Sequence, residues 1–167
     1  MPKFEFTFTE EHFLTIFQKR AQISKQALVF KILRILLLVP LAFLFYATLQ
    51  TGETILMVVI ILIALLLLFS KVIERWMLIQ SFRNSPFRNE QISIQLTDEG
   101  YIGEGTVGST KLGWTAFTKA VRFEDGLLLF QGPGLNNWLP FSTLVEGSPD
   151  DVAGFVQSKV SDFQNRR

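Results

Sequence analysis

The feature that most constrains this chain is a pair of charge-free apolar blocks joined by only five residues. The blocks are Ile35–Leu49 and Ile55–Phe69, and Gln50–Thr54 connects them. Fifteen residues of helix rise about 22 Å, so each block needs flanking residues to cross a hydrocarbon core of roughly 30 Å. Neither block has a polar face, and a chain of 167 residues has little other material to enclose two such helices. The sequence therefore predicts a transmembrane helical hairpin with spans at about residues 31–49 and 55–73.

The charges around the blocks predict how this hairpin is oriented. Its flanks are basic, with Lys19, Arg20, Lys25, Lys31 and Arg34 before it and Lys71, Arg75, Arg83 and Arg88 after it. The connecting segment carries only Glu53. Because short loops rich in Lys and Arg stay in the cytoplasm, we expect a two-pass protein of the bacterial inner membrane with both termini cytoplasmic.

Membrane lipids are the first expected partners. Basic side chains near the membrane surface attract anionic headgroups, at about 1 kcal/mol for each well-placed charge. The candidate lipid contacts are Lys31, Arg34, Lys71 and Arg75.

The composition narrows the classes of function. A net charge of +1 argues against a nucleic-acid-binding protein, which usually carries a basic excess. The chain has no cysteine, which excludes a disulfide framework, a cysteine-ligated zinc site and a thiol nucleophile. His12 is the only histidine, and its place early in a predicted helix is typical of an ordinary surface residue. Neither apolar block contains Asp, Glu, His, Asn or Gln, so a conduction role is not expected unless an oligomer lines a pore with backbone groups and Thr48.

The chain after the hairpin shows the pattern of a small antiparallel β domain. Apolar and polar residues alternate in short runs, and turn residues separate the runs at intervals of about ten residues. The predicted strands lie at residues 89–97, 101–103, 106–112, 118–123, 127–131 and 137–139, with turns at Asp125-Gly126 and Pro133-Gly134.

A helix is predicted to close this domain. Ser148 is placed to be its N-cap and Pro149 its first residue. An apolar stripe of Val152, Phe155, Val156, Val160 and Phe163 is expected to lie on the sheet.

The N-terminus predicts a strand over Lys3–Thr9, followed by a helix with Thr9 as its N-cap. Phe4, Phe6 and Phe8 share one face of that strand, which would expose an apolar stripe and a free edge if the strand stood alone. We therefore expect it to pair with the C-terminal sheet. The chain then divides into residues 1–26, which pack with the C-terminal domain, the hairpin at 27–83, and the β domain at 84–167.

Two motifs that suggest chemistry have simpler structural explanations. Gly103–Gly108, "GEGTVG", matches a dinucleotide-binding pattern, but a strand follows it instead of the helix that this motif requires, so it predicts a hairpin. The paired carboxylates Asp98-Glu99, Glu124-Asp125 and Asp150-Asp151 fall at turns or at a helix start. We therefore expect no catalytic residue, no metal ligand, no cofactor and no enzymatic activity.

At Trp114, Gly126–Leu129 and Leu139-Pro140 the chain resembles the YcxB-like family of bacterial membrane proteins. The stretch "LGWTAFTKAVRFEDGLLLF" is similar to the family's Trp, its strand with an acidic turn and its aliphatic strand, and "NNWLPF" is similar to its apolar-Pro step. The resemblance implies a membrane hairpin and a pleckstrin-homology-like β domain closed by a C-terminal helix, with no established enzymatic activity. Many relatives place a basic residue after the Pro, whereas this chain has Phe141.

Two kinds of function fit these expectations. The first is a membrane-anchored module whose β domain binds a protein or a lipid headgroup, with Trp114, Trp138, Pro140 and Phe141 as candidate contacts. The second is an immunity protein that protects the inner membrane from a pore-forming or membrane-active toxin. The expected protein partner is accordingly a membrane protein or a toxin, and the sequence leaves a second copy of the chain open as a partner.

Overall fold

The computed structural model describes residues 1–132 and 135–166, without side chains at residues 25–27. The expected turn at Pro133-Gly134 and the side chain of Lys25 in the basic flank lie outside the described residues. The chain separates into two compact units. Unit 1 combines residues 1–20 with residues 81–167, and unit 2 comprises residues 21–80.

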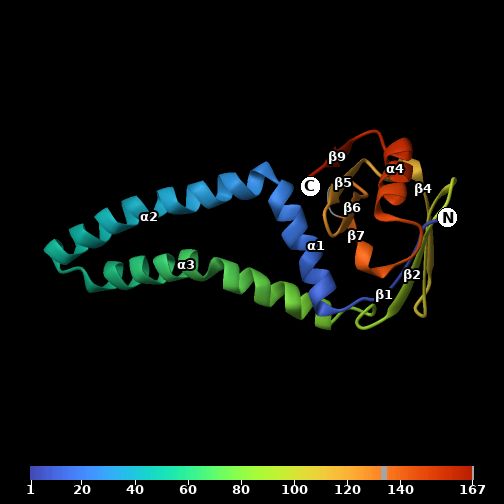
Figure 1. Ribbon diagram of the computed structural model, residues 1–167. Helices are drawn as coiled ribbons and strands as arrows, with labels where there is room; N and C mark the ends of the chain where they lie inside the picture. The colour runs from blue at the N-terminus through green and yellow to red at the C-terminus, as the bar shows by residue number, and fades with distance from the viewer. Residues whose placement is uncertain (133–134, 167) are drawn as a thin grey trace. The chain divides into compact units, whose positions relative to one another are not determined.

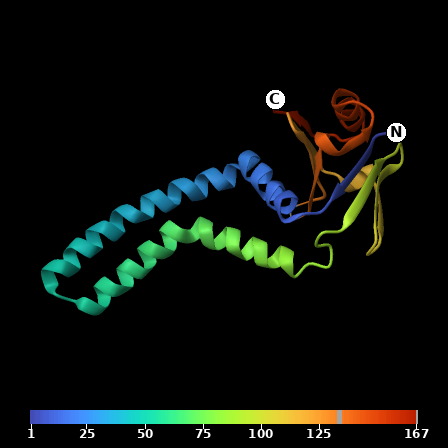
Figure 2. The same ribbon diagram turned by 60° about the horizontal axis from the view of Figure 1, so that its bottom comes forward.

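Unit 2 is a pair of helices that run in opposite directions and meet at a tight turn (Figures 1 and 2). Helix α2 spans Lys25–Thr51 and continues through Pro40, and α3 spans Thr54–Arg83. Both are long and apolar enough to cross a membrane. Gly52 makes the turn with a φ of 72°, a left-handed conformation that glycine adopts without strain.

The side chains that α2 and α3 shield from solvent follow a narrow stripe on each helix. Residues four and three apart lie on the same helix face, which allows the two stripes to meet as a seam. The stripe comprises Arg34, Leu38, Leu41, Phe45 and Thr48 on α2, and Met57, Ile60, Ala64, Leu67 and Ser70 on α3. From Leu28 to Met77, the large apolar side chains outside the seam stay exposed.

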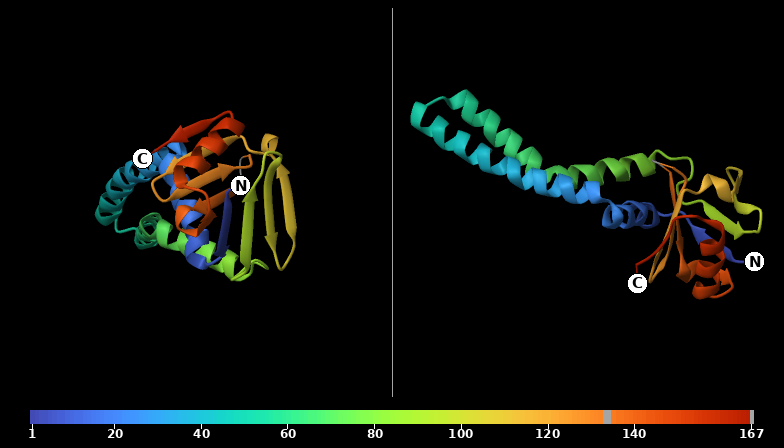
Figure 3. Two further views of the ribbon diagram at one scale, coloured as in Figure 1. Left: turned by 45° about the vertical axis from the view of Figure 1, so that its right-hand side comes forward. Right: turned by 90° about the horizontal axis from the view of Figure 1, so that it is seen from above.

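Unit 1 contains a five-stranded antiparallel sheet, sheet A, in the order β4-β3-β2-β1-β8 (Figure 3). Its strands are β1 at Lys3–Thr7, β2 at Gln91–Leu96, β3 at Gly100–Gly105, β4 at Ser109–Gly113 and β8 at Leu144–Glu146. The N-terminal strand β1 pairs with β2 on one side and with β8 on the other. The pairing expected between the N-terminus and the C-terminal sheet is therefore present, although the strand ends at Thr7 and not at Thr9.

A four-stranded sheet, sheet B, has the order β7-β6-β5-β9. It consists of β5 at Lys119–Phe123, β6 at Gly126–Phe130, β7 at Asn136–Pro140 and β9 at Phe163–Asn165. Short 3-10 helices, η1 at Trp114–Ala116 and η2 at Phe141–Thr143, join it to sheet A. Because β9 runs parallel to β5, sheet B is mixed, and the expectation of a purely antiparallel domain was wrong in this respect.

The C-terminal helix α4 spans Pro149–Lys159 and packs against both sheets. Ser148 caps it as predicted, in a reciprocal capping box with Asp151. The helix ends four residues before Phe163, because the chain turns extended at Val160 and pairs with the open edge of β5. The predicted helical stripe was therefore wrong at Phe163, which lies on β9, and neither β8 nor β9 was predicted.

One apolar core lies between the two sheets and α4. Its fully buried members include Phe4 on β1, Leu96 on β2, Leu127 on β6 and Val152 on α4. Unit 1 therefore depends on residues from both ends of the chain, and the fold is of the α+β class.

Sheet B is buried on its other face as well. That face presents Val121, Phe123, Leu128 and Trp138, all less than a tenth exposed. Helix α1, Glu10–Ile23, lies against this face and begins with Thr9 Oγ1 accepting from His12 N, as predicted. A cluster of Phe8, Phe13 and Phe82 joins its first turns to the end of α3.

Candidate functional site

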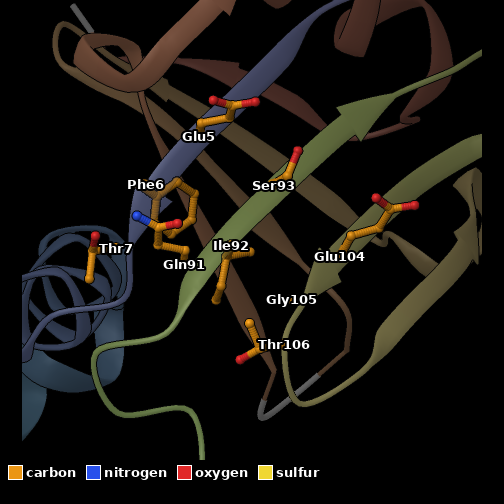
Figure 4. Close-up of a pocket in the computed structure, with 9 residues that line it drawn as sticks. All are labelled: Glu5, Phe6, Thr7, Gln91, Ile92, Ser93, Glu104, Gly105 and Thr106. Carbon is orange, nitrogen blue, oxygen red and sulfur yellow. The ribbon is translucent and has the colours of Figure 1, made fainter.

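The outer face of sheet A carries an open hollow of about 600 Å³ (Figure 4). It crosses three adjacent strands where β1, β2 and β3 pair. Its lining residues are Glu5, Phe6, Thr7, Gln91, Ile92, Ser93, Glu104, Gly105 and Thr106.

The floor of this hollow is polar because the strand register aligns outward-facing side chains. Glu5 lies opposite Ser93, and Ser93 lies opposite Glu104, so two carboxylates flank one hydroxyl on the same face. Lys3 pairs with Glu5 at 2.6 Å, and Glu104 is exposed on the far side of Ser93. The hollow therefore offers chiefly hydrogen-bond acceptors and hydroxyls, which suit a ligand with N–H groups or positive charge.

A buried carboxylate fixes the rim of the hollow. Glu90 is 7% exposed, and its Oε1 accepts from Thr106 Oγ1 at 3.0 Å and from Val107 N at 2.5 Å. A Cβ on Gly105 would lie 2.6 Å from that oxygen, so a side chain there would displace the carboxylate from both donors.

The glycine-rich segment beside this carboxylate is a hairpin, as predicted. Gly105 N donates to Gly108 O, which closes the turn between β3 and β4. The contact of Glu90 with Gly105 gives a structural reason for one of these glycines, and sequence reasoning missed it.

The predicted contact Trp114 lies inside unit 1. It is 9% exposed, its Nε1 donates to Thr97 O at 2.9 Å, and its ring packs against Phe117 and Phe155. It therefore holds η1 against the core, and little of its side chain reaches the surface.

The predicted contact Trp138 is also buried, at 4% exposed, beneath α1. Its ring meets Phe123 edge to face, and Lys19 Nζ lies 5.0 Å from the ring centre. Pro140 and Phe141 are half-buried, and Phe141 packs at the edge of the core with the Arg122 guanidinium 5.8 Å away. The four candidate contacts thus do not form one exposed site.

A cation–aromatic contact that the sequence did not predict joins α1 to sheet B. Lys19 Nζ donates to both carboxylate oxygens of Asp125, at 2.5 and 2.7 Å, and lies 4.7 Å from the Phe123 ring centre. The Lys19 side chain is only 16% exposed, whereas that of Asp125 is 57% exposed. These residues lie far apart in sequence, and no local pattern marks the pair.

His12 is not the ordinary surface residue that was expected. Its ring stacks on Phe6 with 4.4 Å between centres, and it forms a hydrogen bond with the Trp138 backbone. Burial lowers its pKa to about 4, and the hydrogen bond to Trp138 opposes this shift only in part. His12 is therefore neutral at pH 7 and acts as a packing residue.

The four candidate lipid contacts lie near one level of unit 2. Lys31 and Arg34 are one turn apart on α2, and Lys71 and Arg75 are one turn apart on α3. Arg34 Nη1 donates to Ser70 Oγ, which itself donates to Leu67 O at 2.9 Å. This contact connects the two basic pairs, because Ser70 immediately precedes Lys71.

Within residues 1–132 and 135–166, no group of three or more His, Cys, Asp or Glu side chains could hold a metal ion. Burial raises the pKa of Tyr101 above its usual value, consistent with its place in the core.

Residues 96–157 match the model of the YcxB-like protein family. The match begins at the last residue of β2 and ends within α4, so it covers most of the C-terminal part of unit 1 and none of unit 2. The family resemblance expected from the sequence is confirmed for this part of the chain. No curated protein and no solved structure matches the chain.

Proposed function

We propose that this chain, with its YcxB-like C-terminal part, is a non-enzymatic protein anchored in the bacterial inner membrane by α2 and α3. In this proposal both termini are cytoplasmic, and unit 1 presents a small β module to a partner. The proposal also takes this module to be pleckstrin-homology-like, and two sheets around one core that a C-terminal helix covers support it.

The observation that carries the proposal is the apolar surface of unit 2. Outside the seam, large apolar side chains on both helices are exposed, among them Phe43 at 73% and Ile55 at 84%. Soluble monomers rarely expose apolar patches larger than a few hundred square ångströms, because the hydrophobic effect favours covering them. Lipid acyl chains would cover this surface on every side at once.

The surface of unit 1 favours a protein as the partner of the hollow. Glu5 and Glu104 both face outward there, and like charge would repel anionic headgroups. An extended protein segment with backbone N–H groups or basic side chains complements the same surface. No described feature of either unit favours the immunity role over this one.

The absence of native cysteine allows a direct test of the orientation. We expect Glu53→Cys, at the turn between α2 and α3, to react with a membrane-impermeant maleimide in intact spheroplasts. Gln157→Cys, exposed on α4, should react only after lysis. If Gln157→Cys reacts first, or if alkaline carbonate releases the chain from membranes, the membrane proposal is wrong.

Site-specific photo-crosslinking tests the hollow as a contact surface. A benzophenone side chain at Gln91, which lines the hollow, should trap one defined protein in living cells. The same side chain at Gln157 on α4 is the matched control, since both positions are exposed glutamines of unit 1. Equal products from the two positions would count against the hollow. A product twice the mass of the chain would identify a second copy as the partner.

A further inference from the structure

Arg34 differs from the other charged side chains of unit 2 that the structure describes. Lys31, Glu53, Lys71, Glu74 and Arg75 are exposed, whereas Arg34 is partly buried in the seam between the helices. Its Nη1 donates to Ser70 Oγ on the facing helix. A guanidinium carries five N–H donors in a planar fork, and a single hydroxyl can accept from only some of them. The contact with Ser70 therefore positions the Arg34 guanidinium and leaves further N–H donors for a ligand.

The distance of Arg34 from the turn between α2 and α3 places it near the expected boundary of the hydrocarbon core. Between Arg34 and Thr51 on α2, and from Thr54 to Ser70 on α3, the helices carry no charged residue. Sixteen or seventeen residues of helix rise about 25 Å, and Lys31 and Arg75 lie about 30 Å from the turn. A hydrocarbon core is roughly 30 Å thick, so these basic groups fall where lipid phosphates begin.

The charge at this level is strongly positive. Lys31 and Arg34 come from α2, Lys71 and Arg75 from α3, and Glu74 is the one carboxylate among them. Basic pockets between transmembrane helices on the cytoplasmic side are a recurrent way of binding anionic headgroups. Arg binds phosphate with two parallel hydrogen bonds, which a flexible Lys does not provide.

We propose that Arg34, positioned by Ser70 and surrounded by Lys31, Lys71 and Arg75, binds the phosphate of an anionic phospholipid. The inference rests on the proposed membrane hairpin and goes beyond it. The basic residues attract anionic lipids in general through their charge, and they also form one specific site centred on Arg34. The other three cations raise the local concentration of anionic lipid, and Arg34 supplies the directed contact.

The test compares Arg34→Gln with Lys31→Gln and Lys71→Gln, which remove the same formal charge from exposed neighbours. The purified full chain is placed in phosphatidylcholine nanodiscs with increasing phosphatidylglycerol, and retained phosphatidylglycerol is counted by native mass spectrometry. Each Lys→Gln variant should weaken retention about five-fold, the equivalent of about 1 kcal/mol. Arg34→Gln should weaken it about thirty-fold or more, because directed hydrogen bonds are lost together with the charge.

Ser70→Ala provides a second variant that changes no charge. This variant removes the hydrogen bond that positions the Arg34 guanidinium. It should weaken lipid retention about three-fold, because the guanidinium must then be ordered when the lipid binds. Inorganic phosphate at millimolar concentration should displace no lipid, which separates a membrane-bound ligand from a free anion.

Two results would overturn the site. The first is an equal loss of lipid retention in Arg34→Gln and the two Lys→Gln variants, with no effect of Ser70→Ala. It would mean that the basic residues attract anionic lipid only through their net charge. Displacement of the lipid by inorganic phosphate would assign the residues to a soluble ligand. Both results leave the membrane proposal standing if the variants still resist carbonate extraction, so the two failures are distinguishable.

Discussion

At the scale of single residues, unit 1 shows how burial changes what a side chain does. His12, Trp114 and Trp138 are residue types that often act at functional sites, yet here all three pack against neighbouring side chains of the fold. Glu90, which has no distinctive sequence context, instead determines the geometry of the hairpin beside the hollow. The role of each of these residues therefore depends more on the side chains that surround it in the fold than on its residue type.

The pKa of His12 provides a residue-scale prediction. Because the folded-state pKa is about 4 and the ordinary value is 6.5, the unfolded chain binds more protons between these two values. Stability should therefore be at its full value above pH 6.5 and fall as the pH drops toward 4, by on the order of 3 kcal/mol in total. Since His12 is the only histidine, selective isotope labelling of histidine gives a single ring signal to titrate by NMR.

A His12 ring that titrates near 6.5 in the folded full chain would contradict this packing. The matched variant is His12→Phe, which keeps an aromatic ring against Phe6 and carries no titratable group. In that variant the pH dependence of thermal unfolding between pH 4 and 6.5 should become shallower.

At the scale of elements, helix α1 is attached to sheet B by polar contacts as well as by apolar packing. Its contacts with sheet B include a lysine held by a carboxylate and two aromatic rings, and a histidine bonded to the β7 backbone. Apolar packing adds Ile16 and the cluster of Phe13 and Phe82. Such directed contacts specify one position of a helix on a sheet better than apolar packing alone.

The contact of Lys19 with Asp125 gives the element-scale prediction. Lys19→Met keeps much of the apolar stem but removes the ammonium group, and it should destabilise the attachment of α1 by about 1–2 kcal/mol. The readout is hydrogen exchange at the α1 amides of the full chain in detergent, which should become faster by about ten-fold.

Gln18→Met is the control, because Gln18 is the exposed neighbour of Lys19 on the same helix. Equal exchange rates in the two variants would mean that the aromatic and carboxylate partners add nothing to the attachment. Asp125→Asn should reproduce part of the Lys19→Met effect, since it keeps the hydrogen-bond acceptor but loses the charge.

At the scale of the whole molecule, the chain makes unit 1 from two segments that the hairpin separates. Strand β1 is synthesised before α2 and α3, but its partners β2 and β8 follow them. Sheet A is therefore completed only after the hairpin has been synthesised.

Removal of the N-terminal strand is the corresponding prediction. Deleting residues 1–9 should make residues 84–167 sensitive to protease, because it uncovers β2 and β8 and removes the fully buried Phe4. A large core residue replaced by a small one costs roughly 3–5 kcal/mol, so Phe4→Ser should act in the same direction.

Glu5→Ser is the control for this experiment, because Glu5 neighbours Phe4 on the same strand but faces outward. It should leave the protease resistance of the full chain unchanged. Unchanged resistance after the deletion would mean that the C-terminal sheet folds without β1.

Local patterns in the sequence predict most of the helices and the first strand. The two apolar blocks predict α2 and α3 because each is long, continuous and free of charged residues, and Ser148-Pro149 predicts the start of α4 through its capping geometry. Alternation of Phe4, Phe6 and Phe8 predicts β1, and the resemblance at Trp114 and Leu139-Pro140 identifies the YcxB-like part.

The long-range contacts, in contrast, have no local signal in the sequence and follow from the folded arrangement of the chain. Strand β9 exists because the edge of β5 is open, and its parallel pairing overrides the helical stripe that runs on to Phe163. The burial of Trp138 depends on α1, which lies more than a hundred residues away in the chain, and the packing of Glu90 against Gly105 depends on the β2–β3 register. The physical reason is that periodicity and capping act between near neighbours, whereas partners are chosen by which surfaces the folded chain brings together.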